Sequence, residues 1–342
     1  MTSKLRRPAV LLSILLCTAV AAAVAAKSIA GFGVDRVPAG KITIGYSAWP
    51  GWFPWSVAAE RRFFSANGVD VEMKYFDTYT DSLAALADGT IDANSQTLND
   101  TLISVSAGAK QTIVLVNDNS TGNDQIICAG SINSVADLKG KRVGVEQGTV
   151  DHFLLLLALQ QSSLTQQDVE LEGMPTDAAA AAFAAGDLDC TGVFAPFTTV
   201  ALERPGSFAI ATSAEFPGAI PDHLVFRSDV VDQRPTAVQA VVNTWFETLE
   251  WIKGNGDAAT EIMAGRAGVT VTEYAAYDAG TSIFTHQQNL DAFLPGTTPD
   301  HLNAQANVVA DFMVEAGLVQ VRPSLDALFD SRFVHALPER LQ

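Results

Sequence analysis

Three tryptophans stand close together in a loop-like stretch, where their ring faces would suit a cation or a flat solute. Trp49, Trp52 and Trp55 lie in "SAWPGWFPW" and are three of the chain's five tryptophans. Pro50 and Pro54 restrict the backbone of this stretch. A cation over an indole face gains about 0.5–2 kcal/mol. We expect Trp49 and Trp52 to line a cleft and Trp55 to pack beneath the next helix; the alternative is that Trp52 also packs inward.

Acidic residues recur where strands are expected to end, which is where open α/β sheets bind ligands. Seven such regions hold seven aspartates and no Lys or Arg: 47–55, 77–81, 95–100, 117–124, 147–152, 194–198 and the region of Asp222. An anion buried without cationic partners or several amide donors is costly, so this favours a cation or a neutral, donor-rich solute. The acidic candidates are Asp118, Asp151 and Asp222. The others are expected to be turn or cap residues that face water: Asp77, Asp81, Asp100 and Asp124.

The remaining candidates are side chains that hydrogen-bond or pack at the same level. Thr149 suits the N-cap of a helix whose first amides would face the cleft. Asp151 lies in the first turn of that helix and would repel an anion there, and ordinary capping is the alternative. The full predicted ligand-binding set is Trp49, Trp52, Thr97, Asn99, Asn117, Asp118, Gln147, Thr149, Asp151, His152, Phe194 and Asp222.

Catalytic and metal-binding motifs are missing from the sequence. The five histidines are scattered, and neither HExxH, Gly-x-Ser-x-Gly nor the phosphate-loop pattern occurs. We therefore expect no enzyme activity, no cofactor and no metal.

The elements that would position these residues alternate between short apolar runs and helical runs, which predicts the α/β class. Strands are expected at 41–47, 68–77, 90–97, 111–119, 124–130, 141–148, 169–175, 188–196, 208–212 and 223–229. Helices are expected at 54–64, 81–87, 150–161, 177–185, 235–253, 257–264, 272–279, 298–315 and 324–329, with another short one after 97. The alternation restarts near residue 139, so we predict two lobes, each a mainly parallel sheet flanked by helices. Lobe 1 comprises 41–124 plus 222–342, and lobe 2 comprises 125–221.

The N-terminus and the cysteines indicate an exported protein. Residues 1–26 begin with Lys4, Arg6 and Arg7 and continue without charge to "TAVAAAVAA", the layout of a signal peptide, with an uncleaved anchor as the alternative. Leu15 and Leu16 before Cys17 argue against lipidation. Cys128 and Cys190 would then remain, either paired as a disulfide or buried separately.

The charge of the exported chain limits its partners. Removal of residues 1–26 would leave 18 basic and 38 acidic residues, a net charge of −20 in place of −17. Nucleic acid and anionic membrane surfaces are therefore not expected partners.

Four stretches carry a resemblance to a known family: "IGYSAWPGWFPWSVAAERRFF", "DSLAALADGTIDA", "DLKGKRVGVEQGTVDHFLLL" and "AAAAFAAGDLDCTGVFAP". The chain resembles periplasmic solute-binding proteins of the nitrate/sulfonate/taurine group, which serve ABC importers. "WPGW" and "NDNSTGND" are most similar to members associated with urea- or guanidine-handling carboxylases. In "LADGTIDA" and "FAAGDLDC", Gly89 and Gly186 suit the left-handed residue that ends a helix.

The resemblance implies a two-lobed, type II binding-protein fold with two crossovers, in a periplasmic monomer. It also implies a membrane permease as partner and a small solute captured by closure of the lobes. Guanidine, urea or an amine is the predicted solute, and an alkylsulfonate, taurine, nitrate or bicarbonate is the alternative. A sensor-type binding protein, or an enzyme similar to the pyrimidine synthase of thiamine biosynthesis, is a further alternative; the chain lacks that enzyme's cysteine-rich stretch.

Overall fold

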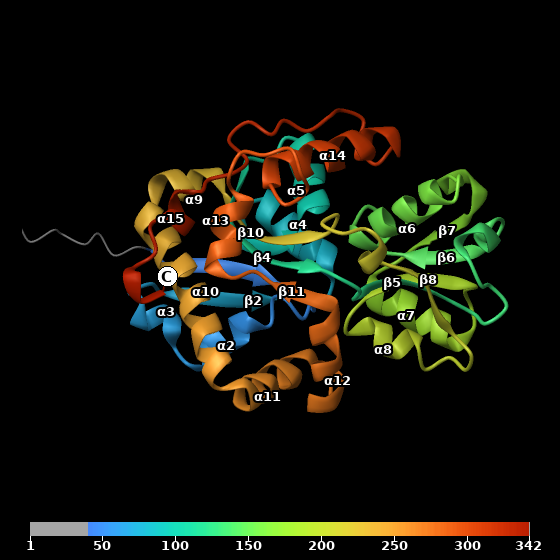
Figure 1. Cartoon of the computed structure of the whole chain (residues 1–342), viewed down its shortest axis with the longest axis horizontal. Coiled ribbons are helices and arrows are strands. Elements are labelled where there is room, and N and C mark those ends of the chain that lie inside the picture. The colour runs from blue at the N-terminus through green and yellow to red at the C-terminus, as the bar shows by residue number, and fades with distance from the viewer. Residues whose placement is uncertain (1–39, 342) are drawn as a thin grey trace, which may run out of the picture. The chain divides into compact units, whose positions relative to one another are not determined.

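The computed structural model describes residues 40–341 of the 342-residue chain, and they belong to one compact unit (Figure 1). The predicted signal peptide 1–26, with Cys17, lies outside the described residues. Within the described part, no helix has both the length and the apolar character needed to cross a membrane.

The first sheet has six strands in the order β11-β4-β10-β3-β1-β2. Strand β1 pairs in parallel with β2 and β3, whereas β10 runs antiparallel to β3 and β4, and β11 runs antiparallel to β4. The strands are β1 (Ile42–Tyr46), β2 (Val71–Tyr75), β3 (Ala93–Thr97), β4 (Gln111–Ser120), β10 (Pro221–Arg227) and β11 (Thr281–Ile283).

The second sheet has five strands in the order β7-β6-β8-β5-β9. Strand β6 is parallel to β7 and β8, and β5 is antiparallel to β8 and β9. These strands are β5 (Asp124–Cys128), β6 (Arg142–Val145), β7 (Glu170–Gly173), β8 (Cys190–Phe194) and β9 (Phe208–Thr212). The expected parallel pairings occur in both sheets, but neither sheet is mainly parallel: three of the five pairings in the first and two of the four in the second are antiparallel.

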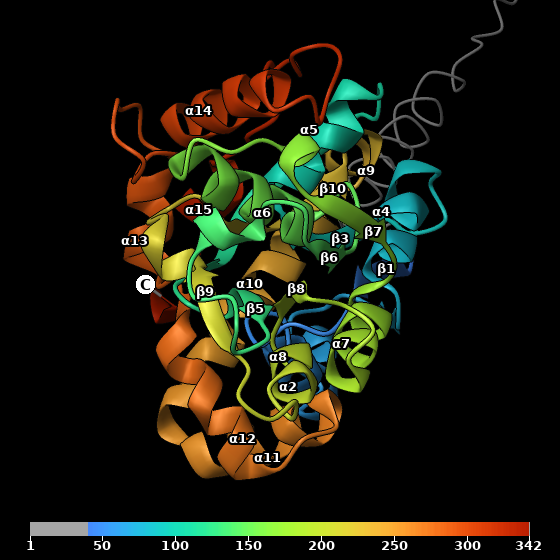
Figure 2. The ribbon, with the colours of Figure 1, turned by 90° about the vertical axis from the view of Figure 1, so that its right-hand side faces the viewer.

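The helices that flank the first sheet come from both ends of the described chain, as the blue and the orange-to-red ribbons in Figure 1 show. Those before the first crossing are α2 (Pro54–Glu60), α3 (Phe63–Ala66), α4 (Tyr79–Ala87) and α5 (Leu98–Ser106). Those after the second crossing are α9 (Ser228–Gln233), α10 (Pro235–Gly254), α11 (Gly256–Ala267), α12 (Val271–Ala276), α13 (His286–Ala292), α14 (Leu302–Glu315) and α15 (Arg332–His335). Figure 2 brings the second sheet forward with its helices α6 (Val150–Gln161), α7 (Thr176–Ala185) and α8 (Phe197–Ala201).

Two expected helices differ in the structure. The helix expected at 54–64 is divided because Arg62 adopts a left-handed backbone with φ of 59°, and α3 starts after it. The helix expected at 324–329 is absent: Ala327 has φ of 57°, and this stretch instead pairs with β4, where the Ile113 amide donates to the Leu328 carbonyl at 2.7 Å. The left-handed conformation expected for Gly89 and Gly186 is confirmed, with φ of 83° and 93°.

The chain changes sheet twice, between β4 and β5 and again between β9 and β10. The two crossings are joined by Ser213, whose hydroxyl contacts that of Ser120 at 2.7 Å and accepts from the Gly122 amide at 2.8 Å. The same two stretches would act as the hinge of two lobes. The lobe boundaries at residues 124 and 222 remain a proposal.

A disulfide joins the strands of the second sheet. Cys128 and Cys190 are register partners on β5 and β8, with their Cα atoms 4.1 Å apart and both side chains buried. The bond therefore fastens the strand that enters this sheet to one that follows it 62 residues later.

Candidate functional site

Four aromatic rings meet where the elements of the first sheet face those of the second, a contact region that we call the seam. Ring centroids are 6.5 Å apart for Trp49 and Trp52, 5.5 Å for Trp52 and Tyr79, 6.3 Å for Tyr79 and Phe194, and 6.2 Å for Phe194 and Trp49. The contacts form a closed circuit, which we call the aromatic box. Three of its members belong to the first-sheet side, and Phe194 ends strand β8 of the second sheet.

The aromatic box borders a small enclosed cavity of about 10 Å³. That volume is room for roughly one water molecule. The cavity is lined by Trp49, Trp52, Tyr79, Thr97, Asp124, Val150, Phe194, Ile220 and Asp222. The seam is therefore nearly filled by its own side chains.

Two aspartates meet behind the box because β4 and β10 pair there. Asp118 and Asp222 are register partners, and their carboxyl groups lie within hydrogen-bonding reach of each other. The indole N–H of Trp49 donates to Asp118 Oδ1 at 2.9 Å. No described N–H or hydroxyl group donates to either oxygen of Asp222, although its side chain is only 1% exposed.

Burial without a counter-ion changes the titration of these acids. Desolvation raises the pKa of Asp118 to about 7, against the lowering effect of the Trp49 hydrogen bond, and also raises the pKa of Asp124 to about 7. Desolvation raises the pKa of Asp222 as well, and the nearby charge of Asp118 adds to this rise. No described Lys or Arg is among the groups that perturb these three pKa values. The site is acidic and lacks a built-in cation.

Two further carboxyl groups occupy helix N-termini across the seam. Glu146, which follows β6, accepts from the Thr80 amide at 2.9 Å in the first turn of α4. The backbone amide of Val150, the first residue of α6, opposes the rise that burial gives to the pKa of Asp100 in α5. The N-termini of α4 and α6 thus each face a carboxyl group from the opposite side of the seam.

Six of the predicted ligand-binding residues come together at this site. Trp49, Trp52, Thr97, Phe194 and Asp222 line the cavity, and Asp118 contacts both Trp49 and Asp222. Their role in binding a ligand remains a proposal.

The other six predicted residues do not line the cavity and are engaged elsewhere. Gln147 is exposed, and His152 Nε2 contacts Gln166 Oε1 at 2.9 Å within the second-sheet part. Thr149 is the N-cap residue of α6 as expected, but its hydroxyl donates to the Glu146 carbonyl at 2.8 Å and accepts from no amide of the helix. The remaining contacts are those of Asn99 with Asp100, Asn117 with Ser95, and Asp151 with Thr176.

Some site residues were missed by sequence reasoning. Asp100 and Asp124 were expected to face water, and this is wrong: they are 1% and 2% exposed because the seam covers both strand ends. Asp77 and Asp81 are exposed as expected. Tyr79 lies between those two aspartates, so its position after β2 was a usable signal, whereas nothing in the sequence marks Ile220.

Gly51 in the tryptophan loop is required for its small size. Its φ is not in the left-handed region, so its conformation is open to other residues. A Cβ at this position would collide with the carboxyl group of Asp118. The loop therefore needs glycine because Asp118 lies directly against its backbone. Trp55 packs inward as expected, with its ring centroid 4.6 Å from that of Trp245.

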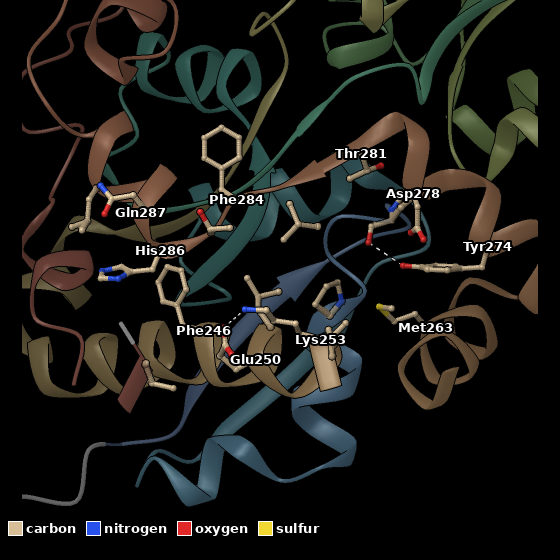
Figure 3. A pocket seen from close by; sticks show the side chains of 18 residues that line it. Phe246, Glu250, Lys253, Met263, Tyr274, Asp278, Thr281, Phe284, His286 and Gln287 are labelled. Carbon is tan, nitrogen blue, oxygen red and sulfur yellow. Dashed lines mark hydrogen bonds and ion pairs between the residues drawn. The ribbon is translucent and has the colours of Figure 1, made fainter. Parts of the chain in front are cut away.

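A larger pocket of about 630 Å³ lies away from this cavity, among side chains of α10, α11, α12, β11 and α13 (Figure 3). Some of its polar groups have partners: Tyr274 donates to the Pro50 carbonyl at 3.0 Å, and Glu250 lies 3.5 Å from Lys253. None of the described buried side-chain atoms without a hydrogen-bond partner belongs to this pocket. Such atoms occur at the cavity in Trp52 and Asp222, so the seam is the better candidate site.

No described group of three or more His, Cys, Asp or Glu side chains is arranged to hold a metal ion.

Known proteins are similar to this chain in sequence and in fold. The taurine-binding periplasmic protein of Escherichia coli is 25% identical over 289 residues, 81% of this chain and 87% of that protein. A protein of Brucella abortus, named only as a binding protein, is 28% identical over 236 residues, 67% of this chain and 72% of that protein. Among solved structures, the alkanesulfonate-binding protein SsuA of Xanthomonas axonopodis pv. citri, bound to MOPS, has a TM-score of 0.73 at 20% identity, covering 85% of this chain and 98% of that one.

The similarity to the SsuA structure shows that the fold is that of a periplasmic binding protein. This confirms the fold predicted from the sequence, and the two helix-flanked sheets agree with it. The model of the NMT1-like family matches residues 35–266. This range includes the aromatic box, the second sheet and the return strand β10. The chain belongs to the NMT1-like family.

Proposed function

We propose that the protein is the extracytoplasmic solute-binding component of an ABC importer and captures a small nitrogen-rich solute, such as guanidinium, urea or an amine, at the seam. The observation that carries the choice of solute is Asp222, a buried carboxyl group without an N–H or hydroxyl donor beside an aromatic box. N–H groups of the solute would donate to this carboxyl, and a positive charge would gain from the ring faces. Trp52 adds an unpartnered indole N–H for an acceptor atom of the solute or for a water.

The volume of the cavity supports a small solute that enters an opened form. About 10 Å³ is too little for any of these solutes, so the lobes must separate or the tryptophans must turn before binding. Opening about the two crossings joined by Ser213 would expose the box, and closure over the solute would present a form that a membrane permease recognises. In this scheme the protein acts as a periplasmic monomer and makes or breaks no covalent bond.

An anionic solute is the second candidate, and the names of the taurine- and alkanesulfonate-binding relatives favour it. Against it, the N-termini of α4 and α6, which are natural anion sites, already face the carboxyl groups of Glu146 and Asp100. A sulfonate at this place would also face Asp118, Asp124 and Asp222 with no described Lys or Arg lining the cavity. These carboxyl groups support the nitrogen-rich solute.

Calorimetric titration of the exported protein tests the proposal. We expect guanidinium, urea or methylammonium to bind with one-to-one stoichiometry and about tenfold or more tighter than taurine, nitrate or bicarbonate, because of the acidic lining. Replacing Trp52 by Leu should weaken this binding about tenfold by removing the ring face and the N–H. Binding of taurine alone would favour the second candidate, and binding unaffected by Trp52→Leu would place the solute elsewhere.

The role of the two helix-capping carboxyl groups gives a separate prediction. The double variant Asp100→Asn, Glu146→Gln keeps the size of both side chains but removes two negative charges from the seam. We expect its affinity for taurine to rise about tenfold, because two negative charges that repel an anion at the N-termini of α4 and α6 are removed. Titration with taurine at fixed ionic strength measures this. If taurine binds no better to the double variant than to the wild type, these carboxyl groups do not exclude anions.

A further inference from the structure

Asp118 and Asp222 face each other from neighbouring antiparallel strands, and neither has a cationic partner. Their register pairing on β4 and β10 holds the two carboxyl groups together, and both side chains are at most 1% exposed. Two ionised carboxylates in such contact would repel each other strongly in a buried setting. A proton shared between them removes most of that repulsion.

The hydrogen-bond donors around the pair are unequal, and this difference distinguishes its members. Asp118 receives the indole N–H of Trp49 at 2.9 Å, which stabilises a negative charge on it. Asp222 receives no N–H or hydroxyl donor from any described residue. Its carboxyl is therefore the one that gains by keeping a proton and donating it to Asp118.

The surrounding titratable groups add no positive charge to the pair. Asp118 interacts electrostatically with Tyr274 of α12 and with Asp124 of β5. Asp222 interacts in the same way with Asp124, with Asp100 of α5 and with Tyr79 of α4. The acids among them are negative or neutral, and the pKa values of both tyrosines are raised by burial, which keeps them neutral. The proton on the pair is thus not displaced by a neighbouring Lys or Arg.

We propose that at slightly alkaline pH Asp222 is a protonated carboxylic acid that donates its proton to ionised Asp118, so that the pair carries one negative charge beside the cavity. One consequence of this assignment rests on the proposed function: the preferred solute is then a monovalent cation, such as guanidinium, rather than neutral urea. Asp222 is then a neutral hydrogen-bonding group, and Asp118 is the charge that selects the cation. Trp49 is the positioning residue that keeps the charge on Asp118.

The sign of the pH dependence follows from this assignment. The cation binds best when Asp118 is ionised, so affinity is full above the pKa of Asp118 and falls as the pH drops through it. Since the pKa of Asp118 is raised to about 7, the loss should extend from slightly alkaline to slightly acidic pH. Binding of a cation lowers that pKa and so releases protons within the same range.

Infrared difference spectroscopy tests the location of the proton without any solute. At slightly alkaline pH, Asp222→Asn should remove the carbonyl band of a protonated carboxylic acid, whereas Asp118→Asn should remove a carboxylate band. Asp187→Asn, an exposed acid of the second-sheet part, is the matched control and should remove a carboxylate band. Loss of a carboxylate band from Asp222→Asn would overturn the assignment.

Calorimetry with guanidinium chloride then tests the consequence. We expect Asp118→Asn to weaken binding about tenfold more than Asp222→Asn, because only the first removes the charge. Affinity for guanidinium should fall with decreasing pH in the wild type and in Asp222→Asn, and much less in Asp118→Asn. Equal losses in the two variants, or urea binding as tightly as guanidinium, would contradict the charge assignment. If no nitrogen-rich solute binds, the proposed function fails, while the infrared result still decides where the proton lies.

Discussion

Gly51→Ala is expected to abolish most solute binding while leaving the protein folded. The added Cβ would occupy the space of the Asp118 carboxyl group, so either the tryptophan loop or Asp118 must move. Either movement breaks the hydrogen bond from Trp49 to Asp118 and disturbs the aromatic box. We expect a loss of about thirtyfold or more in affinity for guanidinium, because a displacement of about 1 Å at a site can cost that much. The overpacking should lower the free energy of unfolding by about 1–3 kcal/mol.

Gly254→Ala is the matched control for this substitution. Gly254 ends α10, its φ is not left-handed, and a Cβ there meets nothing within 4 Å. It should leave both affinity and stability close to the wild type. Calorimetry and chemical denaturation measure the two quantities. An affinity of Gly51→Ala within about threefold of the wild type would mean that the contact between the loop and Asp118 does not matter for binding.

Removal of the disulfide is expected to have the largest effect on stability. Cys128 and Cys190 close a loop across a sequence separation of 62 residues, so the unfolded chain regains considerable freedom in the variant Cys128→Ala, Cys190→Ala. The loop-entropy relation gives a loss of about 4 kcal/mol in the free energy of unfolding. The truncation of two buried side chains adds to it. Denaturant titration at constant pH measures the change.

Reduction of the wild-type protein provides the comparison for this double variant. Both cysteines are fully buried, so reductant should act only as the protein unfolds, and the reduced wild type should then lose a similar amount of stability. Neither side chain lines the cavity, so solute binding to the folded variant should persist. A stability loss below about 1 kcal/mol would show that the bond does not constrain the unfolded chain.

Most of the fold could be predicted because its signals are local. The alternation of strands and helices, the glycines that end α4 and α7 and the resemblance of the tryptophan loop each depend on short stretches of chain. The prediction of a helix at 324–329 was wrong because this segment contacts β4, more than 200 positions earlier, and does not form a helix face. A pattern of residue types does not distinguish these two uses.

The candidate site was predicted only in part, for a related reason. Residue types alone selected Trp49, Asp118 and Asp222, since aromatic and acidic residues without nearby basic ones indicate a site for a cation. They did not reveal that Asp100 and Asp124 are buried, because burial depends on which surface covers a strand end. Gln147 and His152 follow β6 in the expected region, but their side chains do not reach the cavity.

The composition and order of residues by themselves determined the α/β class, the acidic and aromatic character of the site and the family. Only the tertiary structure decided which side chains meet: the pairing of β4 with β10 brings Asp118 against Asp222, and the seam brings Phe194 to the three rings of the first-sheet side. The physical reason is that neighbouring residues in the sequence determine local backbone preferences. The pairing of charges and the exclusion of water instead depend on segments that meet only after the chain has folded.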